Sequence, residues 1–191
     1  YRRYLFYAFG FFILFTLIGF ISAYYDKEFV RIILGDEYVN KTIENIEKGN
    51  AVGVYQQGSN WGSAISIIFN NLKVGAVLFI YGLFGGVGTL YALLQNSIML
   101  GAFQYFFHEH GALKESVSGI WLHGVFEIFS MVVEAMAGLI LGASILFPKT
   151  YSRFNSFKLG FKDAFKIFLS TVPFTIVAGI IEGYVTRYAL V

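Results

Sequence analysis

The sequence contains no cysteine, which excludes disulfide bonds and thiolate metal sites. It also has little charge: 14 basic and 12 acidic side chains are 14% of the 191 residues, against about 25% in a typical soluble domain. So little charge excludes a disordered, highly charged binding tail and argues against a soluble globular enzyme. Hydrophobic residues make up 57% of the chain. We therefore expect an integral membrane protein with a single transmembrane domain over residues 1–191.

Five apolar segments are long enough to cross a bilayer, which requires about 20 residues. We predict spans at about 4–25, 63–84, 86–107, 119–147 and 167–190. A glycine cluster divides the second span from the third, and a broken or re-entrant helix pair is the alternative for this stretch. The predicted fold class is an all-α, polytopic membrane helix bundle.

The segment 26–61 between the first two spans is polar. Apolar residues recur in it at helical spacing on both sides of Gly35-Asp36, and Gly49-Asn50 ends the second pattern. The pattern predicts two short amphipathic helices that lie along the outer membrane surface.

Basic residues predict the orientation of the chain in the membrane. Arg2 and Arg3 precede the first span, and the segment 149–166, which we expect to be a loop, carries five basic residues and one acid. Five spans place both segments in the cytoplasm and the segments 26–61 and 108–118 outside. We expect a multi-pass protein of the inner (plasma) membrane, with its N-terminus cytoplasmic and membrane lipid as a partner. No nucleic-acid partner is expected.

Polar residues inside the predicted spans form one stripe, although a charge there costs a few kcal/mol. At about 100° per residue, four polar side chains of the fourth span share a narrow face. This face is roughly 16 Å long, at about 1.5 Å per residue. We call it the polar seam: His123, Glu127, Ser130 and Glu134, joined by Glu182 of the last span. Lys73 or Arg187 can supply a counter-charge.

Three interpretations of the polar seam are open. Its side chains can hydrogen-bond across helices and hold the bundle together. They can carry protons or cations, as buried carboxylates do in transporters. They can also bind a transition metal such as zinc, through His123 and Glu127 with His108 and His110 at the outer end. No cofactor is otherwise expected, and the sequence predicts no soluble enzyme activity because it has no phosphate loop, thiolate or Ser-His-Asp pattern.

Pairs of glycines four residues apart occur in three spans. Such pairs allow helices to approach closely in lipid, within one chain or between two. The pairs are Gly82/Gly86, Gly138/Gly142 and Gly179/Gly183. Packing between two chains would make the protein a homodimer.

Several short motifs between residues 60 and 187 resemble stage II sporulation protein M-like membrane proteins. They are NNLK at 70–73, GGVGTLY at 85–91, QNSIMLG at 95–101, LHGVFE at 122–127, AGLILG at 137–142 and GIIEG at 179–183. One departure is Leu122, where this family often has a proline that would break the helix before His123.

The resemblance implies a function but little chemistry. The sporulation member is a multi-span scaffold for two peptidoglycan-degrading proteins, and many relatives are longer at the N-terminus, so Tyr1 is a candidate point of truncation. The resemblance also implies that the polar positions of the family are Asn70, Asn71, Asn96, His123, Glu127 and Glu182. With Lys73, the three asparagines are the supporting polar residues that we expect beside the seam. We therefore expect a scaffold or interaction protein of the cell envelope, which associates with itself or with other envelope proteins. A small transporter that uses the polar seam is the alternative, and an intramembrane metal-binding protein is the second alternative.

Overall fold

The predicted all-α class is confirmed by a computed structural model, which describes residues 1–49, 60–148 and 150–186. The described residues form helices and no strand. In chain order the α-helices are α1 (Arg2–Tyr25), α2 (Lys27–Leu34), α3 (Asp36–Glu47), α4 (Asn60–Ile80), α5 (Val87–Glu109), α6 (Leu113–Leu146) and α7 (Arg153–Ile180). A short 3₁₀ helix, η2 (Tyr81–Phe84), follows α4, and a π-helical segment, η3 (Ile181–Thr186), follows α7.

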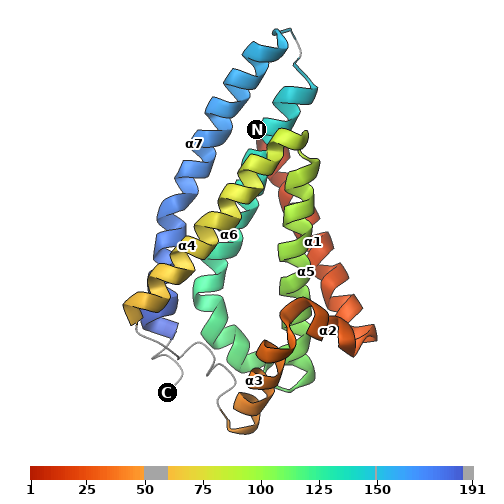
Figure 1. The fold of residues 1–191 in the computed structure, drawn as a ribbon, viewed down its shortest axis with the longest axis vertical. Coiled ribbons are helices and arrows are strands. Elements are labelled where there is room, and N and C mark those ends of the chain that lie inside the picture. Colours follow the sequence, from red (N-terminus) through yellow and green to blue (C-terminus); the bar gives the residue numbers. More distant parts are fainter. Residues whose placement is uncertain (50–59, 149, 187–191) are drawn as a thin grey trace.

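The long helices alternate in direction along the bundle (Figure 1). α1, α5 and α7 run toward the lower end of the view, whereas α4 and α6 run toward the upper end. The N-terminus of α1 and the α6–α7 connection therefore lie toward one end, and α2, α3 and the α5–α6 connection lie at the other. The two predicted cytoplasmic segments share one end, and the two predicted outer segments share the opposite end.

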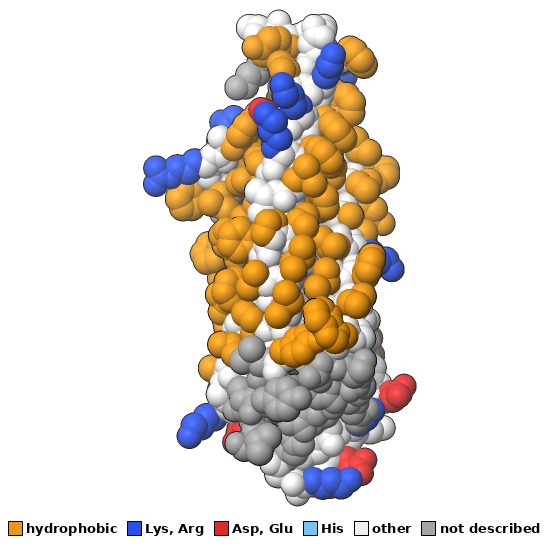
Figure 2. All heavy atoms as spheres, turned by 90° about the vertical axis from the view of Figure 1, so that its left-hand side faces the viewer, with side chains coloured by type: hydrophobic (Ala, Val, Ile, Leu, Met, Phe, Trp, Pro, Cys, Tyr) orange, Lys and Arg blue, Asp and Glu red, His pale blue; other side chains and the backbone are white. Residues whose placement is uncertain are grey.

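Four helical stretches have the length and apolar composition of membrane spans: Arg2–Tyr25, Trp61–Phe84, Leu113–Leu146 and Arg153–Tyr184. Figure 2 shows apolar side chains over most of the middle of one face, as expected of a surface that meets lipid. α5, with 23 residues, is about as long as two of these four stretches. It is more polar than they are, because its sequence contains Gln95, Asn96 and Gln104. The predicted number of five spans, and their orientation, stay predictions.

The glycine cluster forms the turn between α4 and α5. Gly85 and Gly86 have φ angles of 65° and 84°, in the left-handed region that glycine enters without strain. α4 and α5 run in opposite directions and separate from each other with distance from this turn, and α6 packs against both (Figure 1). The stretch 63–107 is therefore a pair of separate antiparallel helices.

The two amphipathic helices predicted after the first span are present as α2 and α3. The Asp26 side chain caps α2 by accepting a hydrogen bond of 3.0 Å from the backbone N–H of Glu28, and Gly35 separates the helices at a φ of 85°. Their buried side chains, Val30 and Val39, join one apolar cluster with the C-terminal part of α5. Their apolar faces therefore pack on the bundle, which differs from the predicted contact with lipid, and residues 50–59 of the outer segment lie outside the described residues.

The expected loop over 149–166 is wrong, because α7 begins at Arg153. Ser152 caps this helix by accepting a hydrogen bond from the backbone N–H of Asn155. Phenylalanines between the basic residues give the segment a second, apolar face that packs as a helix; Phe157, for example, contacts an apolar cluster of α4, α6 and α7. Similarly, α6 runs without a break through Leu122, so the helix break of the family pattern is missing here.

Glycines allow the helices to pack at close range within the chain. A Cβ atom on Gly82 would lie 2.3 Å from the carbonyl oxygen of Gly138, and one on Gly142 would lie 2.2 Å from the backbone nitrogen of Gly86. A Cβ on Gly179 would lie 2.4 Å from the Ile68 side chain, and Gly183 is buried in η3. These glycines therefore allow close packing between helices of one chain. The sequence alone had left open whether they pack within one chain or between two.

We expect Gly138→Ala to destabilise the protein by about 1–3 kcal/mol, because the new methyl group would meet the Leu78 carbonyl oxygen at 2.2 Å. Gly124→Ala on the same helix is the matched control, since a Cβ there meets nothing within 4 Å. The control should be neutral or slightly stabilising. Thermal unfolding of the detergent-solubilised proteins measures both, and equal midpoints would contradict the close packing.

Candidate functional site

The polar seam faces the interior of the bundle. His123, Ser130 and Glu134 are each exposed by 3% or less, and Glu127 is half-buried. All four lie on α6, the longest helix, which contacts α1, α4, α5, α7 and η3. The helical periodicity in the sequence therefore identified the correct face of this helix.

Each acidic or basic member of the seam contacts a polar side chain of another helix. The Asn71 amide of α4 donates a hydrogen bond to Glu127 Oε1. The Thr171 hydroxyl of α7 lies 2.8 Å from Glu134 Oε1, and His123 Nε2 lies 3.6 Å from Glu182 Oε2 of η3. These contacts connect α6 to α4, α7 and η3, because a polar group away from water needs a partner inside the protein.

The Thr171 hydroxyl has a second acceptor within reach. It also lies 2.7 Å from the carbonyl oxygen of Phe168 on its own helix. Its one hydrogen is therefore shared between the Glu134 carboxyl of α6 and a backbone carbonyl of α7.

A pocket of about 160 Å³ opens beside the seam, between α4, α5, α6 and α7. Its polar lining comes from Glu127, Ser130 and Glu134 of α6, Asn70 and Asn71 of α4, Asn96 of α5 and Thr175 of α7. The Ser130 hydroxyl is buried and has no hydrogen-bond partner among the described residues. The space is large and polar enough to hold water or a small cation.

Among the described residues, the carboxyl groups of the seam have no basic neighbour other than His123. Lys73 is exposed on the surface, and within the described ranges neither lysine nor arginine lies within ion-pair distance of Glu127, Glu134 or Glu182. The predicted counter-charge from Lys73 is therefore wrong. Arg187, the other candidate, lies outside the described residues.

A comparison with protein families accounts for the short motifs found in the sequence between residues 60 and 187. The model of the stage II sporulation protein M family matches residues 8–187, nearly the whole chain. The chain belongs to this family. No curated protein and no solved structure matches the chain significantly. Together with the apolar helices, the match identifies a membrane protein of the stage II sporulation protein M family and confirms the resemblance found in the sequence motifs.

The residues predicted to bind metal in this family member do not come together. His108 is exposed beside aromatic rings, and His110 Nδ1 lies 2.8 Å from the carbonyl oxygen of Phe106 on its own helix. In the part of the chain that the structure describes, no three histidine or acidic residues are grouped closely enough to hold a metal ion. Binding of zinc or another transition metal stays a prediction.

Sequence reasoning missed Thr171, Thr175 and Gly75. Thr175 lines the pocket, and a Cβ on Gly75 would lie 2.4 Å from the Glu134 carboxyl group, so a larger residue there would displace the end of the Glu134 side chain. A spacing of four residues between two threonines in an apolar helix was the signal for a polar face on α7. For Gly75 the sequence offered no comparable signal, because its role depends on which helix packs against it.

We expect Thr171→Val to destabilise the bundle by about 1 kcal/mol, the size of an interhelical hydrogen bond in a membrane protein, because Glu134 loses its partner. Thr16→Val is the control: its hydroxyl donates a 2.8 Å hydrogen bond to Phe12 within its own helix α1. Unfolding midpoints in detergent report both effects. A larger loss from Thr16→Val than from Thr171→Val would contradict a role of the seam in joining helices.

Proposed function

We propose that this family member is a scaffold or interaction protein of the cell envelope, in the plasma membrane. The observation that carries this proposal is the platform formed by α2 and α3, which is held on one end of the bundle. Its apolar side chains pack on Tyr105, Phe106 and Phe107 of α5. An ordered polar surface outside the apolar spans is what a membrane scaffold needs to hold a partner.

The platform carries a net negative charge, because it has six acidic side chains and four basic ones. All six of its acidic side chains are exposed: Asp26, Glu28, Asp36, Glu37, Glu44 and Glu47. Two of them form ion pairs within the platform, Asp36 with Arg31 at 2.9 Å and Glu44 with Lys48. Lys27 pairs instead with Glu109 of α5 at 2.7 Å, and this carboxylate raises the pKa of Lys27. The platform is thus attached to α5 by charge as well as by apolar contact.

The polar seam supports the same proposal. A scaffold must keep its helices in one arrangement, and the seam connects α6 to three neighbouring elements. The glycine pairs are used within the chain, so self-association as a homodimer would have to use other surfaces.

We expect a photo-crosslinking residue at Glu37, on the platform, to give a discrete protein adduct in native membranes. The same residue at Leu17, half-exposed in the middle of α1, is the control and should react with lipid. The mass of the adduct separates a second copy of the chain from another envelope protein. Absence of any protein adduct at Glu37, when Leu17 shows that the reaction works, would contradict the scaffold.

A second candidate function is binding or conduction of protons or small cations. The pocket favours it, because two carboxylates, Glu127 and Glu134, line a space that also contains the unpartnered hydroxyl of Ser130. Conduction requires a polar path through the apolar spans, and this pocket places two carboxyl groups of α6 beside open space within the bundle.

Flux through liposomes distinguishes the two functions. If the protein is only a scaffold, wild type and Glu134→Gln should both show the background proton and cation leak of empty liposomes. If it conducts, wild type should exceed the background, and Glu134→Gln should remove most of that flux. Glu115→Gln, at an exposed position of α6, is the control and should behave like wild type in either case.

A further inference from the structure

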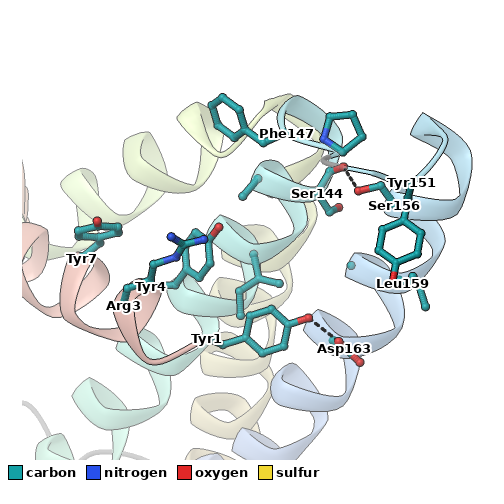
Figure 3. Close-up of a pocket in the computed structure, with 14 residues that line it drawn as sticks. Tyr1, Arg3, Tyr4, Tyr7, Ser144, Phe147, Tyr151, Ser156, Leu159 and Asp163 are labelled. Carbon is teal, nitrogen blue, oxygen red and sulfur yellow. Dashed lines mark hydrogen bonds between the residues drawn. The ribbon is translucent and has the colours of Figure 1, made fainter.

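A large crevice lies at the end of the bundle opposite the platform, between α1, α6 and α7. Its volume is about 750 Å³, which is within the range of small-molecule sites. Figure 3 shows its walls: Tyr4 and Tyr7 of α1 lie on one side, Phe147 lies at the end of α6, and Leu159 of α7 lies opposite. The walls are therefore aromatic and apolar, with polar atoms at a few points.

Two hydrogen bonds hold the walls of the crevice together. The Tyr1 phenol donates to Asp163 of α7, and the Ser156 hydroxyl donates to the Ser144 carbonyl oxygen of α6 at 2.7 Å (Figure 3). The bond to Asp163 raises the pKa of Tyr1 to about 12, so the phenol is neutral at physiological pH. The crevice is thus a defined feature of three packed helices.

The end of the bundle that contains the crevice is rich in basic side chains. Exposed basic side chains lie on α1 and α7: Arg2, Arg3, Arg153, Lys158, Lys162 and Lys166. Between Glu134 and Glu182 the sequence has a single acid, Asp163, and residues 1–25 contain none. Figure 2 shows several Lys and Arg side chains toward the upper end of the molecule, among apolar side chains.

One basic side chain, Arg3, lines the crevice itself. The one acid in its lining, Asp163, is the acceptor for the Tyr1 phenol. The lysines of α7 are exposed on the same helix as Leu159 and add positive charge to this end of the bundle. A basic pocket between membrane helices, next to an apolar surface, is typical of a site for an anionic lipid head group.

We propose that this crevice binds an anionic phospholipid. The phosphate is held by Arg3, the exposed lysines of α7 add to the positive potential around it, and the first part of the acyl chains lies along Tyr4, Tyr7 and Leu159. Charge complementarity selects an anionic head group over a neutral one. The apolar walls select a lipid over a free phosphate ion, because phosphate leaves them empty.

The test titrates phosphatidylglycerol, phosphatidylcholine or inorganic phosphate into the whole chain in neutral detergent and follows its thermal unfolding. A ligand that binds the native state raises the midpoint as its concentration rises. We expect phosphatidylglycerol to raise the midpoint by several degrees, phosphatidylcholine to raise it much less, and phosphate to have no effect at the same concentration.

Three variants locate the site. Arg3→Gln should weaken the apparent affinity for phosphatidylglycerol about tenfold, which corresponds to the loss of one charge-assisted hydrogen bond. Arg2→Gln is the matched control, because Arg2 is also exposed but does not line the crevice, and it should retain the affinity of wild type. Ala143→Leu narrows the crevice without a change of charge and should also weaken binding.

Specific results would overturn the proposal. Equal stabilisation by phosphatidylcholine and phosphatidylglycerol would mean that any lipid solvates this surface. Equal losses in Arg2→Gln and Arg3→Gln would mean diffuse attraction to the basic end. If Arg3→Gln lowers the unfolding midpoint even without added lipid, Ala143→Leu becomes the deciding variant. Wild-type affinity of Ala143→Leu for phosphatidylglycerol would then exclude the crevice as the binding site. These outcomes do not depend on whether the platform binds a partner.

Discussion

The structure depends on one constraint: a polar group inside the apolar spans must find its partner within the protein. α6 carries the polar seam, and α4, α7 and η3 each supply a polar side chain to it. Asn71, Thr171 and Glu182 are the partners of the three contacts measured. The arrangement of α4, α7 and η3 around α6 satisfies this constraint, and the position of the pocket follows from it.

Glycine residues let the helices approach closely enough for these polar contacts to form. Glu134 can lie against α4 because Gly75 presents no side chain to it, and the backbone of α6 can approach the α4–α5 turn because Gly142 faces Gly86. Van der Waals packing rather than the hydrophobic effect drives helix association in lipid, so close backbone approach contributes directly to stability. The same glycines that shape the bundle are therefore unavailable for contact with a second chain.

The two ends of the bundle differ in charge, and each of the two proposed binding surfaces lies at one of them. The platform carries six exposed acidic side chains and four basic ones, whereas the opposite end has six exposed basic side chains and one acid, Asp163, near an apolar crevice. An acidic, ordered surface suits a protein partner outside the membrane, and a basic crevice suits the anionic lipids of the cytoplasmic leaflet. Both proposals agree with the orientation that the basic residues predicted.

Much of the fold followed from the sequence, because bilayer thickness and helical periodicity act locally along the chain. The apolar runs, the boundary at Gly35 and the buried face of α6 are consequences of residue order alone. The start of α7 at Arg153 was missed because its basic residues suggested a loop, although the phenylalanines between them pack as a helix. Periodicity identifies the buried face of a helix but not the helix that packs against it. Only the tertiary structure therefore showed the partners of Glu127 and Glu134, the exposure of Lys73 and the crevice. Each of these depends on residues that are far apart in the chain and are brought together by packing.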